Sequence, residues 1–148
     1  MAAPRHTYLL EPGRWSARGS YLDAAGTAVP ASGESRVEHR AEEWVNESWL
    51  RLELPERPVL ATRQQIEPLG PGESTGLWTA ESGTLGRLLG RYVVVADAIL
   101  SVWSSEDERH TGTECLVLQP DGSYRVHGCL LRESELVSAW VVRLERAG

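Results

Sequence analysis

The stretch that decides the fold is a predicted hairpin, Thr111-Gly-Thr-Glu-Cys-Leu-Val-Leu-Gln119 followed by Pro120-Asp-Gly122 and Ser123-Tyr-Arg-Val-His-Gly-Cys-Leu-Leu131. Both arms are rich in β-branched and aromatic residues, which favour strands. Pro120 presets φ for the first corner of a type I turn, and Gly122 supplies the positive-φ position of a bulged hairpin. The stretch therefore predicts an antiparallel pair in which Cys115 lies opposite His127 and Val117 lies opposite Arg125.

The same kind of pattern extends outward from this hairpin. Further strands are predicted at residues 14–22, 34–40, 44–54, 61–67, 75–81, 91–96, 98–104 and 135–145. In the first of them, Trp15 and Tyr21 fall on one face while Arg14 and Arg18 fall on the other, which is the period of two of a half-buried strand. Residues 1–12 are a lead-in, and residues 82–89 fit either a single helical turn or a wide loop.

About ten short strands joined by short turns predict an all-β fold. We expect an antiparallel up-and-down meander that closes, or nearly closes, into a barrel, because closure removes the exposed edges of the sheet. At 148 residues the chain is long enough for one domain with its own core, and no linker or repeat divides it. A barrel of eight to ten strands leaves room inside for side chains and at most a small ligand.

Composition excludes several classes of function. The net charge is −6 and all 15 cationic residues are Arg, with no basic cluster, so we expect no nucleic-acid partner. No apolar run reaches the roughly 20 residues of a membrane span, and the N-terminus has no signal-peptide pattern. With two Cys and no export signal, we expect a reduced, cytoplasmic protein. The bias toward Arg is typical of a GC-rich coding sequence, so we expect a bacterial protein.

A short motif carries a family resemblance. Gly13-Arg-Trp15, at the start of the first predicted strand, resembles the Gly-x-Trp that opens lipocalins. An Arg near the last strand, Arg143 or Arg146, is similar to the wider calycin superfamily, in which the first-strand Trp often packs against such an Arg across the closed base of the barrel. The resemblance covers nearly the whole chain. It implies a lipocalin-like or fatty-acid-binding-like barrel that holds a ligand, without naming the ligand.

Two departures from that superfamily limit what the resemblance implies. Residues 27–33 are too few for the helical lid that fatty-acid-binding proteins carry between their first two strands. Nitrobindin-type haem barrels use a His near the C-terminus as iron ligand, and no His lies beyond His127. We therefore expect no cofactor.

The faces of the hairpin yield one candidate for chemistry. The face that carries Leu116 and Tyr124 is the more apolar one and is expected to line the interior, which makes Glu114 an inward carboxylate beside Gly128. A buried carboxylate finds a cationic or hydrogen-bonding partner, or its pKa rises. Glu114 is therefore either a structural group, near a barrel mouth or paired with an Arg, or else a ligand anchor or a general acid/base. His39 faces inward on its own strand and leaves the same choice; if both share a cavity, they would form an acid/base pair near neutral pH.

The two thiols indicate neither a disulfide nor a metal site. Cys115 and Cys129 fall diagonally on one face of the hairpin, which is poor geometry for a disulfide. A metal site from these two and His127 lacks any CxxC or HxxxH spacing, so we expect free thiols and no metal. No Walker loop, GxGxxG after a strand, GxSxG or DxDxDG loop is present.

The inward positions predict an amphipathic cavity. On the strand of Trp103, Leu100 and Val102 compete with it for the inward face. The candidate ligand-binding residues are Tyr21, His39, Gln64, Trp78, Trp103, Glu114, Tyr124 and Trp140. So many polar and aromatic groups exceed what core filling needs, and a solvated cavity supplies their partners.

We expect a protein that binds a small, partly hydrophobic molecule. One alternative is a small barrel enzyme, cyclase- or isomerase-like, that acts on a hydrophobic substrate mainly by shaping it. The other is a homo-oligomeric interaction module, such as a homodimer, that uses an exposed Trp44 or Trp49 patch. The sequence leaves open the ligand, the presence of catalysis, the oligomeric state, complete closure and which mouth is open.

Overall fold

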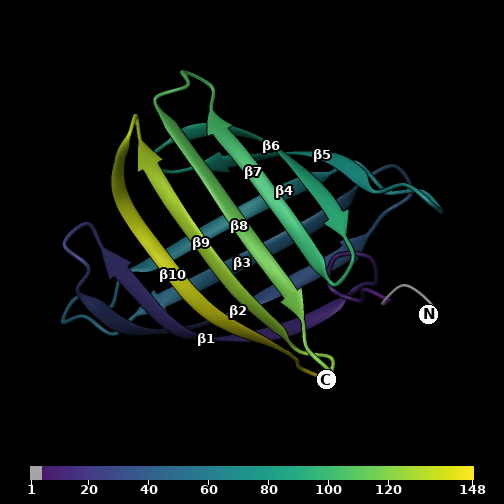
Figure 1. The fold of residues 1–148 in the computed structure, drawn as a ribbon, viewed down its shortest axis with the longest axis horizontal. Helices are drawn as coiled ribbons and strands as arrows, with labels where there is room; N and C mark the ends of the chain where they lie inside the picture. Colours follow the sequence, from purple (N-terminus) through teal and green to yellow (C-terminus); the bar gives the residue numbers. More distant parts are fainter. Residues whose placement is uncertain (1–4) are drawn as a thin grey trace.

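Ten antiparallel strands follow one another and close into a barrel in the computed structural model, which describes residues 5–148 (Figure 1). The strands are β1 Gly13–Asp23, β2 Ala28–His39, β3 Trp44–Leu52, β4 Val59–Ile66, β5 Thr75–Ser82, β6 Gly86–Val95, β7 Ala98–Ser105, β8 His110–Leu118, β9 Tyr124–Arg132 and β10 Glu135–Arg146. Each strand pairs with its sequence neighbours, and β1 closes the ring by pairing with β10. The predicted meander and its closure are confirmed.

The β8–β9 hairpin has the predicted register. Cys115 pairs with His127 and Val117 with Arg125, while Glu114 lies opposite Gly128. The backbone of this turn is closed by hydrogen bonds between Gln119 and both Gly122 and Ser123. Gly122 has φ of 88°, the left-handed conformation that the bulged turn requires.

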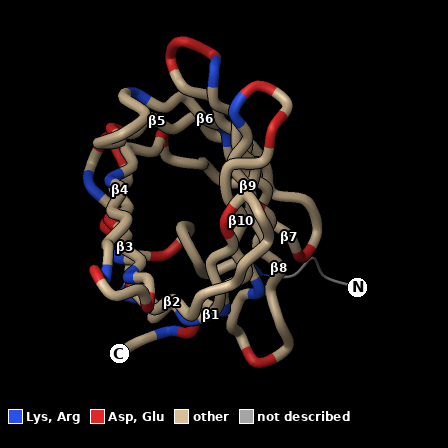
Figure 2. Tube along the Cα trace, turned by 90° about the vertical axis from the view of Figure 1, so that its left-hand side faces the viewer, with Lys and Arg blue, Asp and Glu red and all other residues tan. Residues whose placement is uncertain are grey.

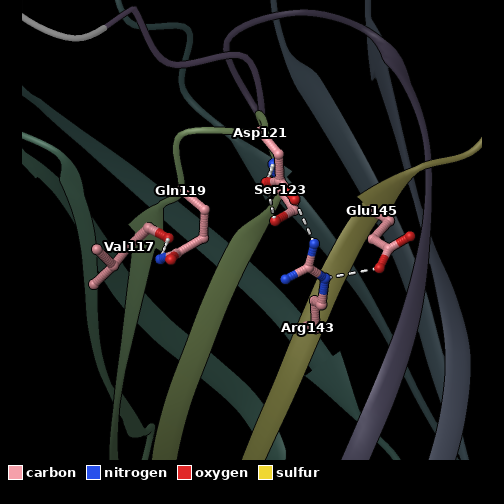
Figure 3. Close-up of polar contacts among 6 residues, drawn as sticks. All are labelled: Val117, Gln119, Asp121, Ser123, Arg143 and Glu145. Carbon is pink, nitrogen blue, oxygen red and sulfur yellow. Dashed lines mark hydrogen bonds and ion pairs between the residues drawn. The ribbon is translucent and has the colours of Figure 1, made fainter.

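Side chains fix this turn to the last strand. Ser123 donates to Asp121 through its N–H (3.0 Å) and its hydroxyl (2.6 Å), and Arg143 of β10 reaches both Asp121 and Glu145 (Figure 3). Gln119 folds back and donates to the Val117 carbonyl at 3.0 Å. The Ser123 hydrogen bonds and then the Arg143 guanidinium lower the pKa of Asp121 to about 2.

Two segments differ from the sequence-based expectation. Residues 82–89 form neither a helical turn nor a wide loop: β5 ends at Ser82, three residues turn the chain, and β6 begins at Gly86. Gly86 has φ of 73°, and the Ser82 hydroxyl accepts the Leu85 N–H, so local turn chemistry explains the tight hairpin. Strand β2 begins at Ala28 rather than at residue 34, because its first residues pair with the end of β1.

The lead-in plugs one end of the barrel, which we call the base. His6, Tyr8 and Leu9 are buried there. The His6 Nε2–H donates to the Ala96 carbonyl (2.8 Å), so Nδ1 accepts from the Tyr124 hydroxyl (2.9 Å). Residues 1–4 of the predicted lead-in lie outside the described residues. The described part of this segment belongs to the core, since it satisfies its own polar groups while burying two large side chains.

An aromatic cluster fills the base. Trp15 is only 1 % exposed, and the Tyr8 and Tyr124 rings meet it edge-on, with centroids 5.5 and 5.7 Å away. The Arg146 guanidinium lies 5.5 Å from the centroid of Trp15 and donates to the Pro12 carbonyl at 3.0 Å. The contact between the first-strand Trp and a C-terminal Arg that the calycin resemblance implied is therefore present.

Arg146 makes this contact, while Arg143 stays in the exposed ion pairs of the turn. Seen after a quarter turn, the strands form a ring and many acidic and basic positions lie in the connecting turns (Figure 2). One such turn, between β7 and β8, contains Glu106, Asp107, Glu108 and Arg109 in succession. Charge is thus concentrated at the ends of the barrel and on its outer side.

Candidate functional site

A cavity of about 740 Å³ occupies the barrel interior above the plugged base. Its lining reaches Tyr21 at the end of β1, Leu60 at the start of β4, Leu85 in the β5–β6 turn, Leu130 near the end of β9 and Ser138 near the start of β10. All of these lie at the end of the barrel opposite the lead-in, which we call the mouth. The cavity is in the size range of small-molecule sites.

Three tryptophans line the cavity, and each lies over a glycine of the neighbouring strand. The pairs are Trp78 with Gly90, Trp103 with Gly112 and Trp140 with Gly128. A Cβ on these glycines would lie 2.1, 2.2 and 2.3 Å from Cε2 of the paired indole. No other residue type leaves room there, because a close approach of this kind needs a position without a side chain. We call these three residues the cavity tryptophans.

The cavity tryptophans form a continuous aromatic wall. The ring centroids of Trp78 and Trp103 are 5.9 Å apart, and those of Trp103 and Trp140 are 6.2 Å apart with planes 25° from parallel. Tyr92 extends the wall, 6.0 Å from Trp78. The Trp78 N–H donates to the Ser101 hydroxyl at 3.1 Å. Within residues 5–148 the Trp103 N–H has no hydrogen-bond acceptor, so it is free to meet a ligand.

Glu114 places a carboxylate in this wall. It lies between Ser101 on β7 and Gly128 on β9, and one oxygen accepts the Trp140 N–H at 2.7 Å. Burial raises its pKa, and the Trp140 hydrogen bond opposes that rise only in part. Apart from Glu114, the one charged residue along the cavity lining is Glu34, which is exposed; the lining contains no Arg or His. Glu114 is thus a partly buried acid that faces no cation among the described residues.

A polar network forms the floor of the cavity. The Tyr8 hydroxyl donates to Ser35 (2.7 Å), Ser35 donates to the Asn46 carbonyl oxygen (2.7 Å), and the Asn46 amide donates to both Tyr8 and Gln64 (3.0 Å each). The Tyr92 hydroxyl donates to the same Gln64 oxygen at 2.8 Å. Burial raises the pKa of Tyr8 to about 12, so this phenol stays neutral. The Gln64 oxygen is fully used, while its NH₂ group has no acceptor within residues 5–148.

Comparison with known proteins shows the fold. No family model matches the chain, and no curated protein matches it. A solved structure does. It is the S-type phycobiliprotein lyase CPES from Guillardia theta, with a TM-score of 0.69 over 94 % of this chain and 89 % of that chain, at 9 % sequence identity. At this identity the likeness shows the fold alone, which is the calycin-like barrel that the sequence predicted. The described residues also include no helix long and apolar enough to cross a membrane.

Six of the eight predicted ligand-binding residues line the cavity. They are Tyr21, Gln64, Trp78, Trp103, Glu114 and Trp140. On β7 the competition for the inward face is resolved in favour of Trp103, since Val102 is 50 % exposed on the outside. Their role in binding a ligand stays a prediction.

The other two predicted residues lie in the base. Tyr124 is fully buried, and its hydroxyl contacts His6 and the Thr7 N–H. His39 donates to the Leu9 carbonyl at 2.7 Å and stacks on Trp44 with centroids 4.0 Å apart. Neither lines the cavity. His39 and Glu114 therefore do not share the cavity, which was the condition for an acid/base pair, because the His39 imidazole donates to the lead-in instead.

Sequence reasoning missed two tyrosines that line the cavity, Tyr8 and Tyr92. Tyr8 lies in the lead-in, where no periodicity shows which side chain points inward. Tyr92 lies in a stretch that is apolar on both faces, so alternation does not show its direction. The spaced glycines were the available signal: Gly90 and Gly112 each stand in a strand interior, where a glycine marks a close approach.

The remaining candidates for chemistry offer less. Cys115 and Cys129 are free, as predicted, and no three His, Cys, Asp or Glu side chains of residues 5–148 lie close enough to hold a metal ion. A smaller hollow of about 400 Å³ lies at the base beside Asp121, Arg143 and Arg146. Its charged groups already pair with one another or with the backbone, so the interior cavity is the better site.

Proposed function

We propose that the protein binds a small, partly hydrophobic molecule inside the barrel. The observation that carries this proposal is an amphipathic cavity of about 740 Å³ that opens at one end. A core built only for stability is filled at the density of an organic crystal, and voids larger than a water molecule are few. Burying apolar ligand surface against the cavity tryptophans contributes roughly 25 cal/mol per Å².

The polar groups that face the cavity would orient such a ligand. The Trp103 N–H and the Gln64 NH₂ are donors without protein acceptors, and the second oxygen of Glu114 is an acceptor without a protein donor among the described residues. A few convergent polar groups in a mainly apolar site are typical of small-molecule recognition. A tetrapyrrole-like molecule, the class that the phycobiliprotein lyase suggests, is one candidate whose rings would lie on the aromatic wall.

A fluorescent probe tests this function directly. N-Phenyl-1-naphthylamine is uncharged near neutral pH and brightens when it leaves water, so its titration reports an accessible apolar cavity. We expect saturable binding with quenching of intrinsic Trp fluorescence. Absence of saturable binding by this probe and by a panel of apolar compounds would contradict the proposal.

Two variants of β1 control for binding at the outer surface. Ala17 lines the cavity, whereas its neighbour Ser16 is exposed on the outside. Ala17→Phe should weaken probe binding about tenfold or more by filling the cavity, and Ser16→Phe should leave it unchanged. Equal affinities in the two variants would place the probe outside the barrel.

One observation also favours an enzyme as a second candidate. A carboxyl whose pKa is raised by burial, as in Glu114, holds its proton to higher pH than an ordinary carboxyl and can act as a general acid or base. A barrel enzyme acting on a hydrophobic substrate would lose turnover in Glu114→Gln while it kept its substrate affinity. Parallel loss of turnover and affinity would mean that Glu114 binds the substrate and does not transfer the proton.

A further inference from the structure

The charged side chains that line the cavity are all acidic. Glu114 lies partly buried in the wall, and the lining residues include no Arg or His to pair with it. Its one hydrogen-bond donor among residues 5–148 is the neutral Trp140 indole, at 2.7 Å. A buried carboxylate is normally paired with a cation or held by several donors, since desolvation of the charged form is costly. Here one oxygen is left without a donor from the described protein.

The groups around Glu114 do not relieve this imbalance. Tyr8 and Tyr92 are the titratable side chains whose charged forms would interact with it, and burial raises the pKa of both phenols. They therefore stay neutral at physiological pH. Ser101, its partner on β7, accepts the Trp78 N–H and makes no hydrogen bond to Glu114 among the described residues. The lining residues hold no counter-charge for Glu114, so a cation that pairs with it would come from a ligand.

The aromatic wall beside Glu114 suits the same kind of partner. Each cavity tryptophan covers a glycine of the next strand with one side and borders the cavity with the rest of its ring. The face of an indole attracts cations through its quadrupole, most strongly where water is excluded. The ring centroids of Trp103 and Trp140 are 6.2 Å apart, and the Trp140 N–H donates to the Glu114 carboxylate. Aromatic faces together with a carboxylate form the usual recognition site for an organic ammonium group.

We propose that the ligand is a cationic amphiphile: an apolar or aromatic body bearing a protonated or quaternary amine, with the nitrogen held between Glu114 and the indoles of Trp103 and Trp140. The proposal rests on the proposed function and specifies its ligand class. The apolar body would lie along the aromatic wall toward the mouth, beside Leu85 and Leu130. A ligand with carboxylates would meet no cation in the lining and would be repelled by ionised Glu114, so a tetrapyrrole-like molecule fits this inference only if it bears no carboxylate there.

Three matched probes test whether the cavity prefers a cationic, a neutral or an anionic ligand. They share a naphthalene ring and differ in one substituent: (1-naphthylmethyl)trimethylammonium is cationic, 1-neopentylnaphthalene is its neutral isostere, and 1-naphthylacetate is anionic. We expect the cation to bind about tenfold or more tighter than the neutral isostere, and the anion to bind weakest, in titrations of Trp fluorescence. This comparison uses the wild-type chain alone, so it does not depend on the folding of any variant.

A pair of variants then locates the charge effect. Glu114→Gln keeps an acceptor for the Trp140 N–H but removes the charge, and it should reduce the preference for the cation to about threefold or less while affinity for the neutral isostere is kept. Glu34→Gln removes the exposed carboxylate of the lining and should leave the preference unchanged. Circular dichroism spectra of both variants confirm that the comparison is made on folded protein.

The outcomes separate this inference from the proposed function. If the neutral or the anionic probe binds as tightly as the cation, the ligand class proposed here is wrong, while the binding function stands. If Glu34→Gln rather than Glu114→Gln removes the preference, the cation sits at the surface and the inference is also wrong. If neither the three probes nor N-phenyl-1-naphthylamine binds, the proposed function itself fails.

Discussion

The base and the mouth half of this barrel both contain inward aromatic residues, but with opposite effects on packing. In the base, Trp15 meets Tyr8 and Tyr124 edge-on and the lead-in fills what remains, so the interior is solid. In the mouth half, each cavity tryptophan lies over a glycine, and space remains beside it. An inward tryptophan therefore fills the barrel or frames a cavity according to what the adjacent strand and the chain terminus offer.

The strongest way to break this contrast is to truncate a tryptophan in each half. Trp15→Ala should lower the free energy of unfolding by about 3–5 kcal/mol, because a fully buried ring leaves a cavity in packed surroundings. Trp103→Ala should cost less than half of that, since its ring already borders open space, but it should weaken probe binding. Urea titration of both variants measures the difference. Equal losses of stability would mean that the two halves are packed alike.

The glycines that admit the cavity tryptophans provide the second test. Gly128→Ala should destabilise the protein by about 1–3 kcal/mol and reduce affinity for bulky probes, because the new Cβ would displace the Trp140 indole. Gly83→Ala is the matched control in the β5–β6 turn, where an added Cβ meets nothing within 4 Å, and it should change stability by less than about 0.5 kcal/mol. A neutral Gly128→Ala would show that the wall is loosely packed.

The third test is the pH dependence of stability that Glu114 causes in the mouth half. Its pKa is raised by burial in the folded state, so the folded protein holds the proton more tightly than the unfolded chain does. Stability is then greatest below the unfolded pKa of about 4.3 and falls as pH rises from there to the folded pKa, above which it is level. Glu114→Gln should remove this decline and raise stability at pH 7 by about 1 kcal/mol.

The check is a series of urea titrations from pH 4 to pH 8 on both proteins. The other titratable residues of the lining are Tyr8, Tyr21, Tyr92 and the exposed Glu34. Glu34→Gln therefore serves as the control for a carboxylate in water. If the free energy of unfolding of the wild-type protein rose relative to that of Glu114→Gln as pH increased from 4 to 8, the raised pKa would be contradicted.

The smallest expected effect lies in the exposed turn at the base. Arg143→Ala removes the contacts to Asp121 and Glu145, but all three side chains are well solvated, and such pairs contribute little. We expect no resolvable change in unfolding at pH 7. Asp121, with its pKa lowered to about 2, should contribute stability above its unfolded pKa that is lost as pH falls toward 2.

Local patterns predicted the fold and most of the cavity wall. The hairpin of residues 111–131 was correct in register because its turn chemistry is local, and alternation placed Tyr21, Gln64 and Trp78 inward. The choice between Val102 and Trp103 was not decidable from β7 alone. It depends on Gly112 across the strand pair, which gives the indole its place.

The base could not be predicted in the same way. Residues 5–12 have no periodicity, and their position depends on contacts with residues about 30 to 120 positions away in the chain. The sequence therefore offered no sign that His39 would bind the Leu9 carbonyl or that Tyr124 would bind His6. Which end of the barrel is closed follows from this segment, so the sequence also left the open mouth undecided.

The spacing of the cavity tryptophans has an optical consequence. Indoles whose centroids are 5.9 and 6.2 Å apart exchange excitation energy before they emit, so the three behave as one chromophore. A molecule that quenches one of them is therefore expected to reduce the emission of the other two as well. The fluorescence of the cavity tryptophans should therefore report whether the cavity is occupied.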